Sequence, residues 1–582
     1  MMATTEPDNT AVGAYALTSL VDGENNTALG IAAGYRIDKG DNSTFLGHYA
    51  GYNATGSSNT FVGSEAGKGG TTSAPYSSGA YNVGVGYQSL MGFTTLQGTT
   101  AIGYEAMTDV TTGEYNVAIG YQAGYYGSGS YNIKIGAFAD KNQNSNGSYN
   151  IVIGYRAVEG RIGDGNVGIG YYGMRYAAGG NSNTAVGDST LQYIQGDYTT
   201  AIGAQAGRFA TGSYNTSLGY RAGRGGTISA PYSSGQSNTA VGYEALKSFT
   251  TGQLNTVIGH TAGTAITTAN YNTIVGAWAG DAVTSGGYNT VLGFQAFSDA
   301  VDGSSHTVAI GYQAGKAITT GDGNIMIGAS AGNTTTDVDK AVIIGQNAGQ
   351  ANMTSAADGT IAIGYEAGKS ITSGARQTFL GYQAGYSTTT GQENVFIGYQ
   401  AGYSNLDNHA NIYIGKQVAY NVADGSYNVA IGEEAMKSTG TAANNHPSYN
   451  VAIGNQAGYN LTTGDYNVFL GSRAGYASTT TQGNVAIGYE AGRYIVTATG
   501  QTAVGYQAMK SMVDGHSNTA FGYQALTSEV ASDESTAIGY QALTNQSGST
   551  TTLGNTAVGH LAGRDTTTAY RNTYVGKSAA LS

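Results

Sequence analysis

The chain of 582 residues contains no cysteine, which excludes disulfide bridges and thiolate metal sites. Proline is scarce, with four residues, and glycine does not recur at every third position, which excludes a collagen helix. Only 10% of the residues are charged, the net charge is −12, and no run of Lys or Arg forms an electrostatic footprint for nucleic acid. No segment has the length of a membrane span or the features of a signal peptide. We therefore expect no nucleic-acid partner, no membrane insertion and no cofactor.

Glycine, aliphatic residues and tyrosine are abundant instead, and they recur in one repeated unit. The sequence holds 93 glycines and 46 tyrosines but a single tryptophan, and 40% of its residues are hydrophobic. The unit reads Asn-(Thr/Val)-Ala-(Ile/Val)-Gly-Tyr-Gln-Ala-(Gly/Leu), followed by a turn, and it occurs 33 times, most often every 17 residues. One such unit cannot bury its own apolar residues, whereas stacked units can. We therefore predict a single continuous solenoid over residues 1–582.

Positions in the unit are numbered here from its first glycine, the anchor glycine, which falls at 13, 30, 47 and so on to 576. Position −3 is Thr, Val or Ile in all 33 units, and position −1 is Val, Ile or Leu in all but one. Position −4 is Asn in 24 units, and position +3 is Ala in 29. The alternation predicts a β-strand, the anchor glycine a bend, and the alanine a second short strand that faces a narrow interior. Asparagine side chains stacked in one column are expected to hydrogen-bond along the stack.

The residues at −3 and −1 point to one side of the predicted strand, and the residue at −2 points to the other. The β-branched and aliphatic residues at −3 and −1 predict that this side is the buried one. Position −2 is also mostly apolar, so we expect a second surface to cover it, either another strand of the same coil or another subunit. The candidate subunit-packing residues are Phe45, Phe61, Val257, Ile274, Phe379, Phe396, Tyr413 and Phe469.

The motif Asn116-Val-Ala-Ile-Gly120, repeated at 428–432, 450–454 and 484–488, resembles the head repeats of trimeric autotransporter adhesins, the YadA-like heads. Similar repeats occur in bacteriophage tail fibres. The resemblance covers nearly the whole chain and implies a left-handed parallel β-roll, three chains side by side and a role in surface attachment. The unit here is slightly longer, and neck, stalk and anchor motifs are not visible. We therefore expect a phage fibre, or a bacterial fibre exported by another route, at a cell surface, on a virion or otherwise outside the cell.

Both ends of the chain fall within the repeat, which starts at Asn9 and runs to the end of the sequence. Solenoids usually cap their terminal coils, because a bare coil offers unpaired backbone groups to other strands. We expect Thr10 and Val12 at one end, and Thr573 and Val575 at the other, to dock on further copies or on a different protein. The remaining interpretation is that the chain is a fragment.

Three units are longer than the others and predict surface loops over residues 64–81, 220–237 and 433–449. Inserted residues in a solenoid often form its binding face, but merely tolerated insertions are the preferred interpretation here. The first two loops share the sequence Ser-Ala-Pro-Tyr-Ser-Ser-Gly, which suggests duplication of a block of coils. The candidate binding residues are Pro75, Tyr76, Pro231, Tyr232, His446 and Pro447.

Tyrosine follows the anchor glycine in 15 units, as in Tyr104 and Tyr365, and precedes the asparagine in others, as in Tyr115 and Tyr466. Stacked coils would align these residues into ladders, which either pack the fibre or stack on the sugar rings of a host or surface glycan. Packing is the preferred interpretation.

The sequence shows no recurring carboxylate pair, no metal-ligand spacing among its seven histidines, and no repeated calcium-binding nonapeptide. We therefore expect no catalytic or metal site, and rank a polysaccharide-degrading fibre low. Ice binding also ranks low, because it needs outward threonines and the threonines at −3 are expected to point inward. The favoured function is a non-enzymatic attachment fibre, with a homotrimer as its expected assembly. The alternative is an architectural filament that polymerises head to tail.

Overall fold

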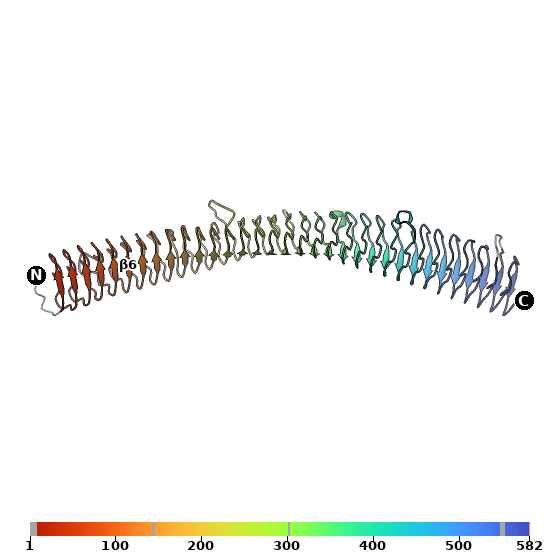
Figure 1. Cartoon of the computed structure of the whole chain (residues 1–582), viewed down its shortest axis with the longest axis horizontal. Coiled ribbons are helices and arrows are strands. Elements are labelled where there is room, and N and C mark those ends of the chain that lie inside the picture. Colours follow the sequence, from red (N-terminus) through yellow and green to blue (C-terminus); the bar gives the residue numbers. More distant parts are fainter. Residues whose placement is uncertain (1–7, 143–145, 301–302, 548–552, 581–582) are drawn as a thin grey trace. The chain divides into compact units, whose positions relative to one another are not determined.

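The computed structural model describes residues 8–142, 146–300, 303–547 and 553–580. The chain divides into two compact units, Met1–Tyr288 and Asn289–Ser582. Each unit is a parallel β-solenoid with one three-residue strand in each coil (Figure 1). The described residues contain 33 strands and two short 3-10 helices, so the predicted all-β parallel solenoid of about 33 coils is confirmed. A single continuous solenoid through both units stays a prediction.

The strands of the first unit are β1 (Thr10–Val12), β2 (Thr27–Leu29), β3 (Thr44–Leu46), β4 (Thr60–Val62), β5 (Val83–Val85), β6 (Thr100–Ile102), β7 (Val117–Ile119), β8 (Ile133–Ile135), β9 (Ile151–Ile153), β10 (Val167–Ile169), β11 (Thr184–Val186), β12 (Thr200–Ile202), β13 (Thr216–Leu218), β14 (Thr239–Val241), β15 (Thr256–Ile258) and β16 (Thr273–Val275).

Those of the second unit are β17 (Thr290–Leu292), β18 (Val308–Ile310), β19 (Ile325–Ile327), β20 (Val342–Ile344), β21 (Ile361–Ile363), β22 (Thr378–Leu380), β23 (Val395–Ile397), β24 (Ile412–Ile414), β25 (Val429–Ile431), β26 (Val451–Ile453), β27 (Val468–Leu470), β28 (Val485–Ile487), β29 (Thr502–Val504), β30 (Thr519–Phe521), β31 (Thr536–Ile538), β32 (Thr556–Val558) and β33 (Thr573–Val575). The 3-10 helices, which the sequence did not predict, are η1 (Ser355–Ala357) and η2 (Ala442–Asn444).

Neighbouring strands within each unit pair in parallel and in register, so that each position of the repeat lies above the same position of the previous coil. Phe379 in β22 pairs with Phe396 in β23, and Phe396 pairs in turn with Tyr413 in β24. The repeat positions are therefore columns in space. The anchor glycine is required here, because Gly30 has a φ of 141° and a Cβ atom there would collide with the carbonyl oxygen of Gly47 in the next coil.

The buried face of the strand is the opposite of the one predicted. Position −2, the central residue, is buried in 31 of the 33 strands, and no residue at −3 or −1 is buried in any of them. We call position −2 the inner column and positions −3 and −1 the outer columns. The interpretation of the inner column as a subunit-packing face is therefore wrong; the same coil covers this column, although it does so through turns and not through the second strand that was the alternative. All eight candidate subunit-packing residues are fully buried: Phe45, Phe61, Val257, Ile274, Phe379, Phe396, Tyr413 and Phe469.

Each aromatic residue of the inner column is accompanied by Gly or Ala at position +4, on the other side of the coil. Phe396 is accommodated by Gly402, where a Cβ atom would lie 2.6 Å from the phenyl ring. Where the inner residue is small, position +4 is large and buried in some coils, as Met436 is opposite Ala430, and glycine in others, as Gly124 is opposite Ala118. Coils that are small at both positions are filled by side chains of a neighbouring coil, as at Gly124, where a Cβ atom would lie 2.8 Å from the side chain of Lys134.

One coil of the first unit places a buried ion pair at these two positions. Lys134 lies in the inner column and Asp140 at position +4, and their Nζ and Oδ2 atoms are 2.7 Å apart with both side chains at most 3% exposed. The Oδ1 atom of Asp140 has no hydrogen-bond partner among the described residues. The pair therefore replaces an apolar pair by two charges that stabilise only each other.

The alanine that recurs at position +3 is buried as expected, for example at Ala123 and Ala457, both of which are fully inaccessible to solvent. The predicted second strand around it is wrong, because in the described coils these residues lie in a run of tight turns. Residues such as Gln122 take a left-handed conformation, with a φ of 52°, which strand geometry does not allow. The turns let a 17-residue coil close around small side chains.

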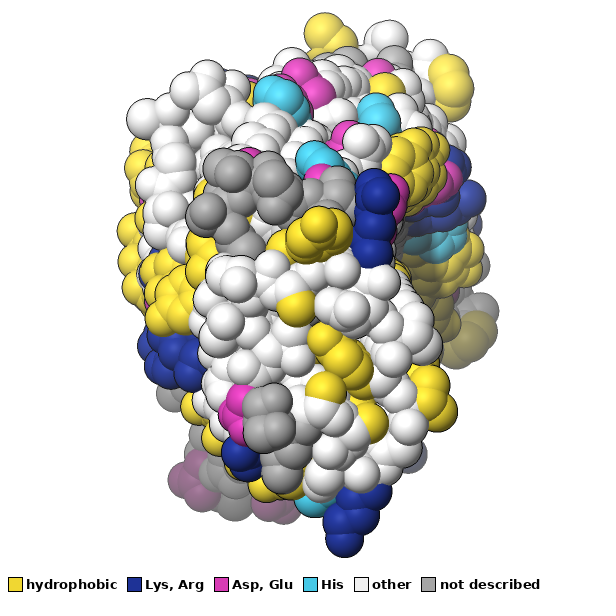
Figure 2. All heavy atoms as spheres, turned by 90° about the vertical axis from the view of Figure 1, so that its right-hand side faces the viewer, with side chains coloured by type: hydrophobic (Ala, Val, Ile, Leu, Met, Phe, Trp, Pro, Cys, Tyr) yellow, Lys and Arg dark blue, Asp and Glu magenta, His cyan; other side chains and the backbone are white. Residues whose placement is uncertain are grey.

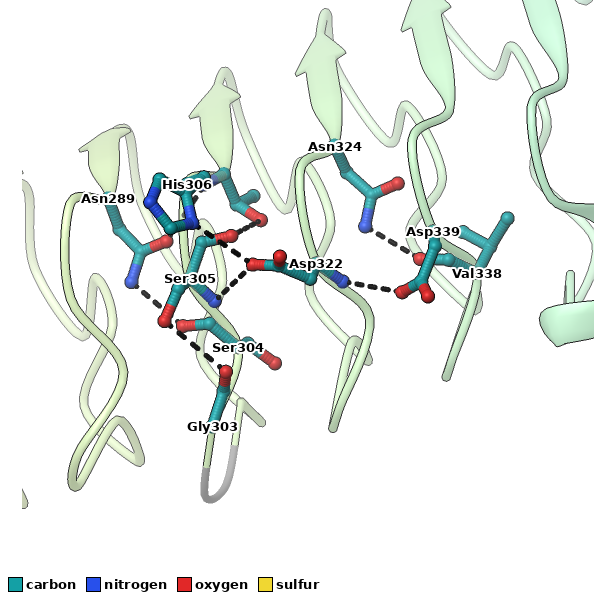
Figure 3. Close-up of polar contacts among 10 residues, drawn as sticks. Asn289, Gly303, Ser304, Ser305, His306, Asp322, Asn324, Val338 and Asp339 are labelled. Carbon is teal, nitrogen blue, oxygen red and sulfur yellow. Dashed lines mark hydrogen bonds and ion pairs between the residues drawn. The ribbon is translucent and has the colours of Figure 1, made fainter.

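The asparagine column holds the coils together mainly through the backbone. The Oδ1 atom of Asn289 accepts a hydrogen bond from the backbone N–H of Thr307, and its Nδ2 donates to the carbonyl of Ser304, at 2.9 and 3.0 Å (Figure 3). Asn324 makes the same contact to Val338 at 2.7 Å. Each side chain therefore satisfies two backbone groups in the turn of the next coil. The expected amide-to-amide bonds also occur, as between Asn428 and Asn411 at 3.1 Å.

Candidate functional site

The outer columns form an apolar surface on the outside of each unit. Their residues are half-buried or exposed, as in β7, where Val117 is half-buried and Ile119 is exposed on either side of the buried Ala118. Across both units the two columns contain only Thr, Val, Ile and Leu, apart from Phe521. Figure 2 shows uncovered hydrophobic side chains, in yellow, on the flanks of the coils. A solvent-facing surface without a single charged residue is unusual in a soluble monomer.

Tyrosine ladders extend this surface on both sides of the strands. Four tyrosines that follow the anchor glycines, from Tyr489 to Tyr540, stack with ring centroids 5.0–5.3 Å apart. Those that precede the asparagines do the same, as in Tyr449 and Tyr466, whose centroids are 5.1 Å apart. The predicted aromatic ladders are therefore confirmed, and their rings remain about half exposed. Stacking holds them in fixed orientations along the unit.

A polar row at position +2 borders the apolar surface. Glu366 accepts hydrogen bonds from Lys369 at 2.7 Å and from Gln383 of the next coil at 2.8 Å. Partial burial opposes ionisation of Glu366, but these hydrogen bonds outweigh it and lower its pKa below the ordinary value. Glutamines continue the row, as in Gln400 and Gln417, which are 3.0 Å apart. The row links coils and leaves the outer columns uncharged.

The outward direction of position −3 also overturns the argument made against ice binding. The threonines of this column were expected to point inward, but all of them lie on the exposed side of their strands. Six consecutive coils of the first unit carry threonine there, in a regular row formed by Thr184, Thr200, Thr216, Thr239, Thr256 and Thr273.

The two long loops that share a sequence are held by the same set of hydrogen bonds at equivalent positions, which we call their frame. In the first, Thr55 donates its backbone N–H to Ser77 at 2.8 Å, and Ser77 lies 3.0 Å from the hydroxyl of Thr71. In the second, Thr211 contacts Ser233 at 2.7 Å, and Ser233 lies 2.9 Å from Thr227. The prolines Pro75 and Pro231 are exposed at the loop tips, and Tyr76 and Tyr232 are half-buried. Both tyrosines fold back over earlier coils.

Each of these two tyrosines packs on residues of earlier coils, which we call its seat, and the two seats differ. Tyr76 accepts a hydrogen bond from Arg36, whose guanidinium carbon is 4.5 Å from the centre of the tyrosine ring. Tyr232 instead packs on Tyr193, with ring centroids 4.4 Å apart. Arg36 and Tyr193 occupy the same repeat position, six residues after an anchor glycine and two coils before the loop. The sequence analysis did not single them out, although comparing the coils that precede each long loop would have found the difference.

A cavity of about 520 Å³ opens beside the first seat. Its lining consists of Ser19, Arg36, Asp38, Lys39, Thr55, Ala74, Pro75 and Tyr76. The cavity volume lies within the range of small-molecule sites, and its lining combines charged groups, hydroxyls and one aromatic ring. The structure thus brings Pro75 and Tyr76 together with a basic group.

The third long loop places its candidate residues differently. His446 is exposed, but Pro447 is buried, and its carbonyl accepts a hydrogen bond from Asn428 at 2.7 Å. Pro447 is therefore part of the frame between coils, and the interpretation of it as a binding-loop residue is wrong. The loop projects instead through η2 and its flanking residues.

The residues expected to dock at the ends are exposed at the two terminal strands. Thr10 and Val12 in β1 and Thr573 and Val575 in β33 all lie on the surface, and Val575 is 70% exposed. Docking through them stays a prediction.

Within the described ranges, no group of three or more His, Asp or Glu side chains is arranged to hold a metal ion. Nor do these ranges contain a helix that is long and apolar enough to cross a membrane. No protein-family model matches the chain, and no curated protein matches it at a significant level. The geometry of the surfaces therefore carries the functional argument.

Proposed function

We propose that the protein is a non-enzymatic fibre, at a cell surface, on a virion or otherwise outside the cell, in which copies of the chain pack side by side through their outer columns. The observation that carries the proposal is the uncharged, uncovered apolar surface along every coil. The resemblance to the heads of trimeric adhesins supports a homotrimer and a role in attachment. Because the same surface recurs on each copy, copies related by rotation can cover one another's outer columns.

The size of this surface is sufficient for stable association. With coils spaced about 4.8 Å apart and strands about 10 Å long, the outer columns of one unit cover roughly 750 Å². A standard protein interface buries about 800 Å² on each partner. The flanking tyrosine ladders enlarge the surface further, and tyrosine is enriched in protein interfaces.

The proposal is tested by measuring the mass of the assembly after a charge is placed in the outer columns. Native mass spectrometry of the purified protein is expected to give three chains. The double variant Ile397→Asp with Ile414→Asp is expected to weaken or abolish the assembly, because each carboxylate would lose its hydration when the outer columns of two copies pack together. Its circular dichroism is expected to stay unchanged, because both positions face outward in the single chain. The control is Ile228→Asp, at an exposed isoleucine on a loop tip, which is expected to leave the mass unchanged.

Two results would contradict the proposal: a monomeric wild-type protein, or a double variant that assembles normally. Negative-stain microscopy adds the alternative arrangement. Filaments that lengthen with protein concentration would favour the architectural, head-to-tail polymer over a closed trimer.

A second candidate function, ice binding, is favoured by the outward row of six threonines in the first unit. A regular row of hydroxyl and methyl groups on a parallel sheet offers a repeating surface to an ordered water lattice. Measurement of thermal hysteresis with the wild type and with Thr239→Lys would test it. Absence of hysteresis in the wild type removes this candidate and leaves the self-association proposal untouched.

A further inference from the structure

We propose that the cavity beside Tyr76 binds a carboxylate-bearing sugar of an acidic polysaccharide, with Arg36 as the group that holds the carboxylate. This inference rests on the attachment function proposed above and names the chemical class of its ligand. The observation behind it is that the two loops share a sequence and a hydrogen-bond frame, whereas the residues on which their tyrosines pack differ.

The guanidinium of Arg36 is held in place, and no carboxylate within the described ranges forms an ion pair with it. It donates one hydrogen bond to the hydroxyl of Tyr76 and lies within 6 Å of the ring centres of Tyr35 and Tyr52. Among the described residues, its Nε has no hydrogen-bond partner. A guanidinium has five N–H donors, so several remain for a ligand. Its planar fork matches the two oxygens of a carboxylate.

The rest of the cavity suits a saccharide. Ser19 and Thr55 offer hydroxyl groups, and the ring of Tyr76 offers a face of the kind on which sugars stack. Lys39 adds a second positive charge, although it also pairs with Asp22 at 3.7 Å on the exposed surface. With Asp38 as the one carboxylate in the lining, the cavity carries a net positive charge in a chain whose net charge is −12.

In the second loop, aromatic residues stand at two of the positions that line the first cavity. At the positions of Ser19 and Arg36 stand Tyr176 and Tyr193, whose ring centroids are 5.2 Å apart. Tyr232 completes the stack, and the ring of Phe209 packs 5.6 Å from Tyr193. Arg208 lies against Phe209 and donates to Gln192, so it is already engaged. The second seat thus places an aromatic ring at the repeat position where the first places a guanidinium.

The duplicated seat supplies a matched pair of variants. Arg36→Tyr converts the first seat towards the second, with a residue that the fold already accepts at that repeat position. Binding of tetragalacturonate, of its methyl ester and of maltotetraose is measured by isothermal titration calorimetry. The wild-type protein is expected to bind tetragalacturonate at least tenfold more tightly than either neutral sugar. Arg36→Tyr and Arg36→Gln are each expected to weaken this binding by roughly tenfold or more, since a charge-assisted bidentate contact is lost. Tyr232→Ala is expected to have no effect.

The inference is overturned if the wild type does not bind tetragalacturonate, if the methyl ester binds equally well, or if Arg36→Gln binds as the wild type does. Equal weakening by Tyr232→Ala would also overturn it, because the site would then not be confined to the first loop. Native mass spectrometry of the same samples separates this inference from the proposed function. A normal assembly that does not bind the sugar would contradict only the proposed ligand, whereas a monomer that binds the sugar would contradict only the proposed fibre.

Discussion

The two faces of each strand are both apolar, but they treat side-chain size in opposite ways. The inner column ranges from Gly84 to Tyr413, and position +4 ranges from glycine to phenylalanine, with Leu90 opposite Gly84 and Ala419 opposite Tyr413. The outer columns hold side chains of nearly one size, from β1 to β33, with Phe521 as the single aromatic. Side-chain size thus varies from coil to coil on the inside, and it is nearly constant on the outside.

This difference indicates what each face contacts. A coil interior is filled by its own side chains and their neighbours, so any combination that fills the space is acceptable. A surface that must fit a long, regular partner has to be even from coil to coil. The evenness of the outer columns therefore agrees with their covering by the equally even surface of another copy.

The largest expected effect is on the inner face. Phe396→Ala removes a fully buried ring beside Gly402 and leaves a cavity, which typically costs about 3–5 kcal/mol. The neighbouring Ile397→Ala is expected to cost much less in a dissociated chain, because Ile397 is partly exposed there. Hydrogen exchange of the amides in β22 to β24 measures both losses locally. Equal losses for the two variants would contradict the assignment of the faces.

The buried ion pair is expected to show the next largest effect. Lys134→Met leaves the carboxylate of Asp140 buried without its partner, which typically destabilises by about 3–5 kcal/mol. The double variant Lys134→Ala with Asp140→Leu restores the small-and-large pair found in other coils and is expected to be at least as stable as the wild type. Thermal unfolding with hydrogen exchange in β7 to β9 measures this. A double variant as unstable as the single one would show that the inner pair is not interchangeable.

The sequence was sufficient to predict the repeat, its parallel stacking, the anchor glycine and the tyrosine ladders, because all of these follow from periodicity. It did not reveal which face is buried, since aliphatic residues occupy both faces and the more uniform face is the one that the pattern predicts as the core. The covariation of position −2 with position +4 was the available signal, as Phe396 with Gly402 and Ala430 with Met436 show. The cavity at Arg36 depends on a loop folding back across two coils, which no local pattern encodes.

The asparagine column should give a smaller effect, because it contributes hydrogen bonds and little apolar burial. Asn428→Ala leaves the backbone N–H of Asn450 and the carbonyl of Pro447 without their partner, which is expected to cost about 1–3 kcal/mol. Tyr427→Ala, at the adjacent exposed tyrosine, is expected to cost less in the dissociated chain. Faster exchange of the Asn450 amide in Asn428→Ala alone would locate the loss. Unchanged exchange would mean that the column does not secure the turns.

The smallest effect is expected in the polar row that borders the outer columns, and it depends on pH. Hydrogen bonds from Lys437 at 2.6 Å and from Gln456 at 2.9 Å lower the pKa of Glu434, and partial burial opposes them only in part. Because the folded pKa lies below the ordinary 4.5, the ionised group stabilises the fold above that pH, and this contribution disappears as the pH falls through the folded value. Glu434→Gln should therefore lower the melting temperature near neutral pH and have little effect in acid. Glu433→Gln, which removes the same charge at a half-exposed position, serves as the control. If the difference in melting temperature between Glu434→Gln and the wild type stayed constant down to acid pH, the effect would come from packing and not from the charge of Glu434.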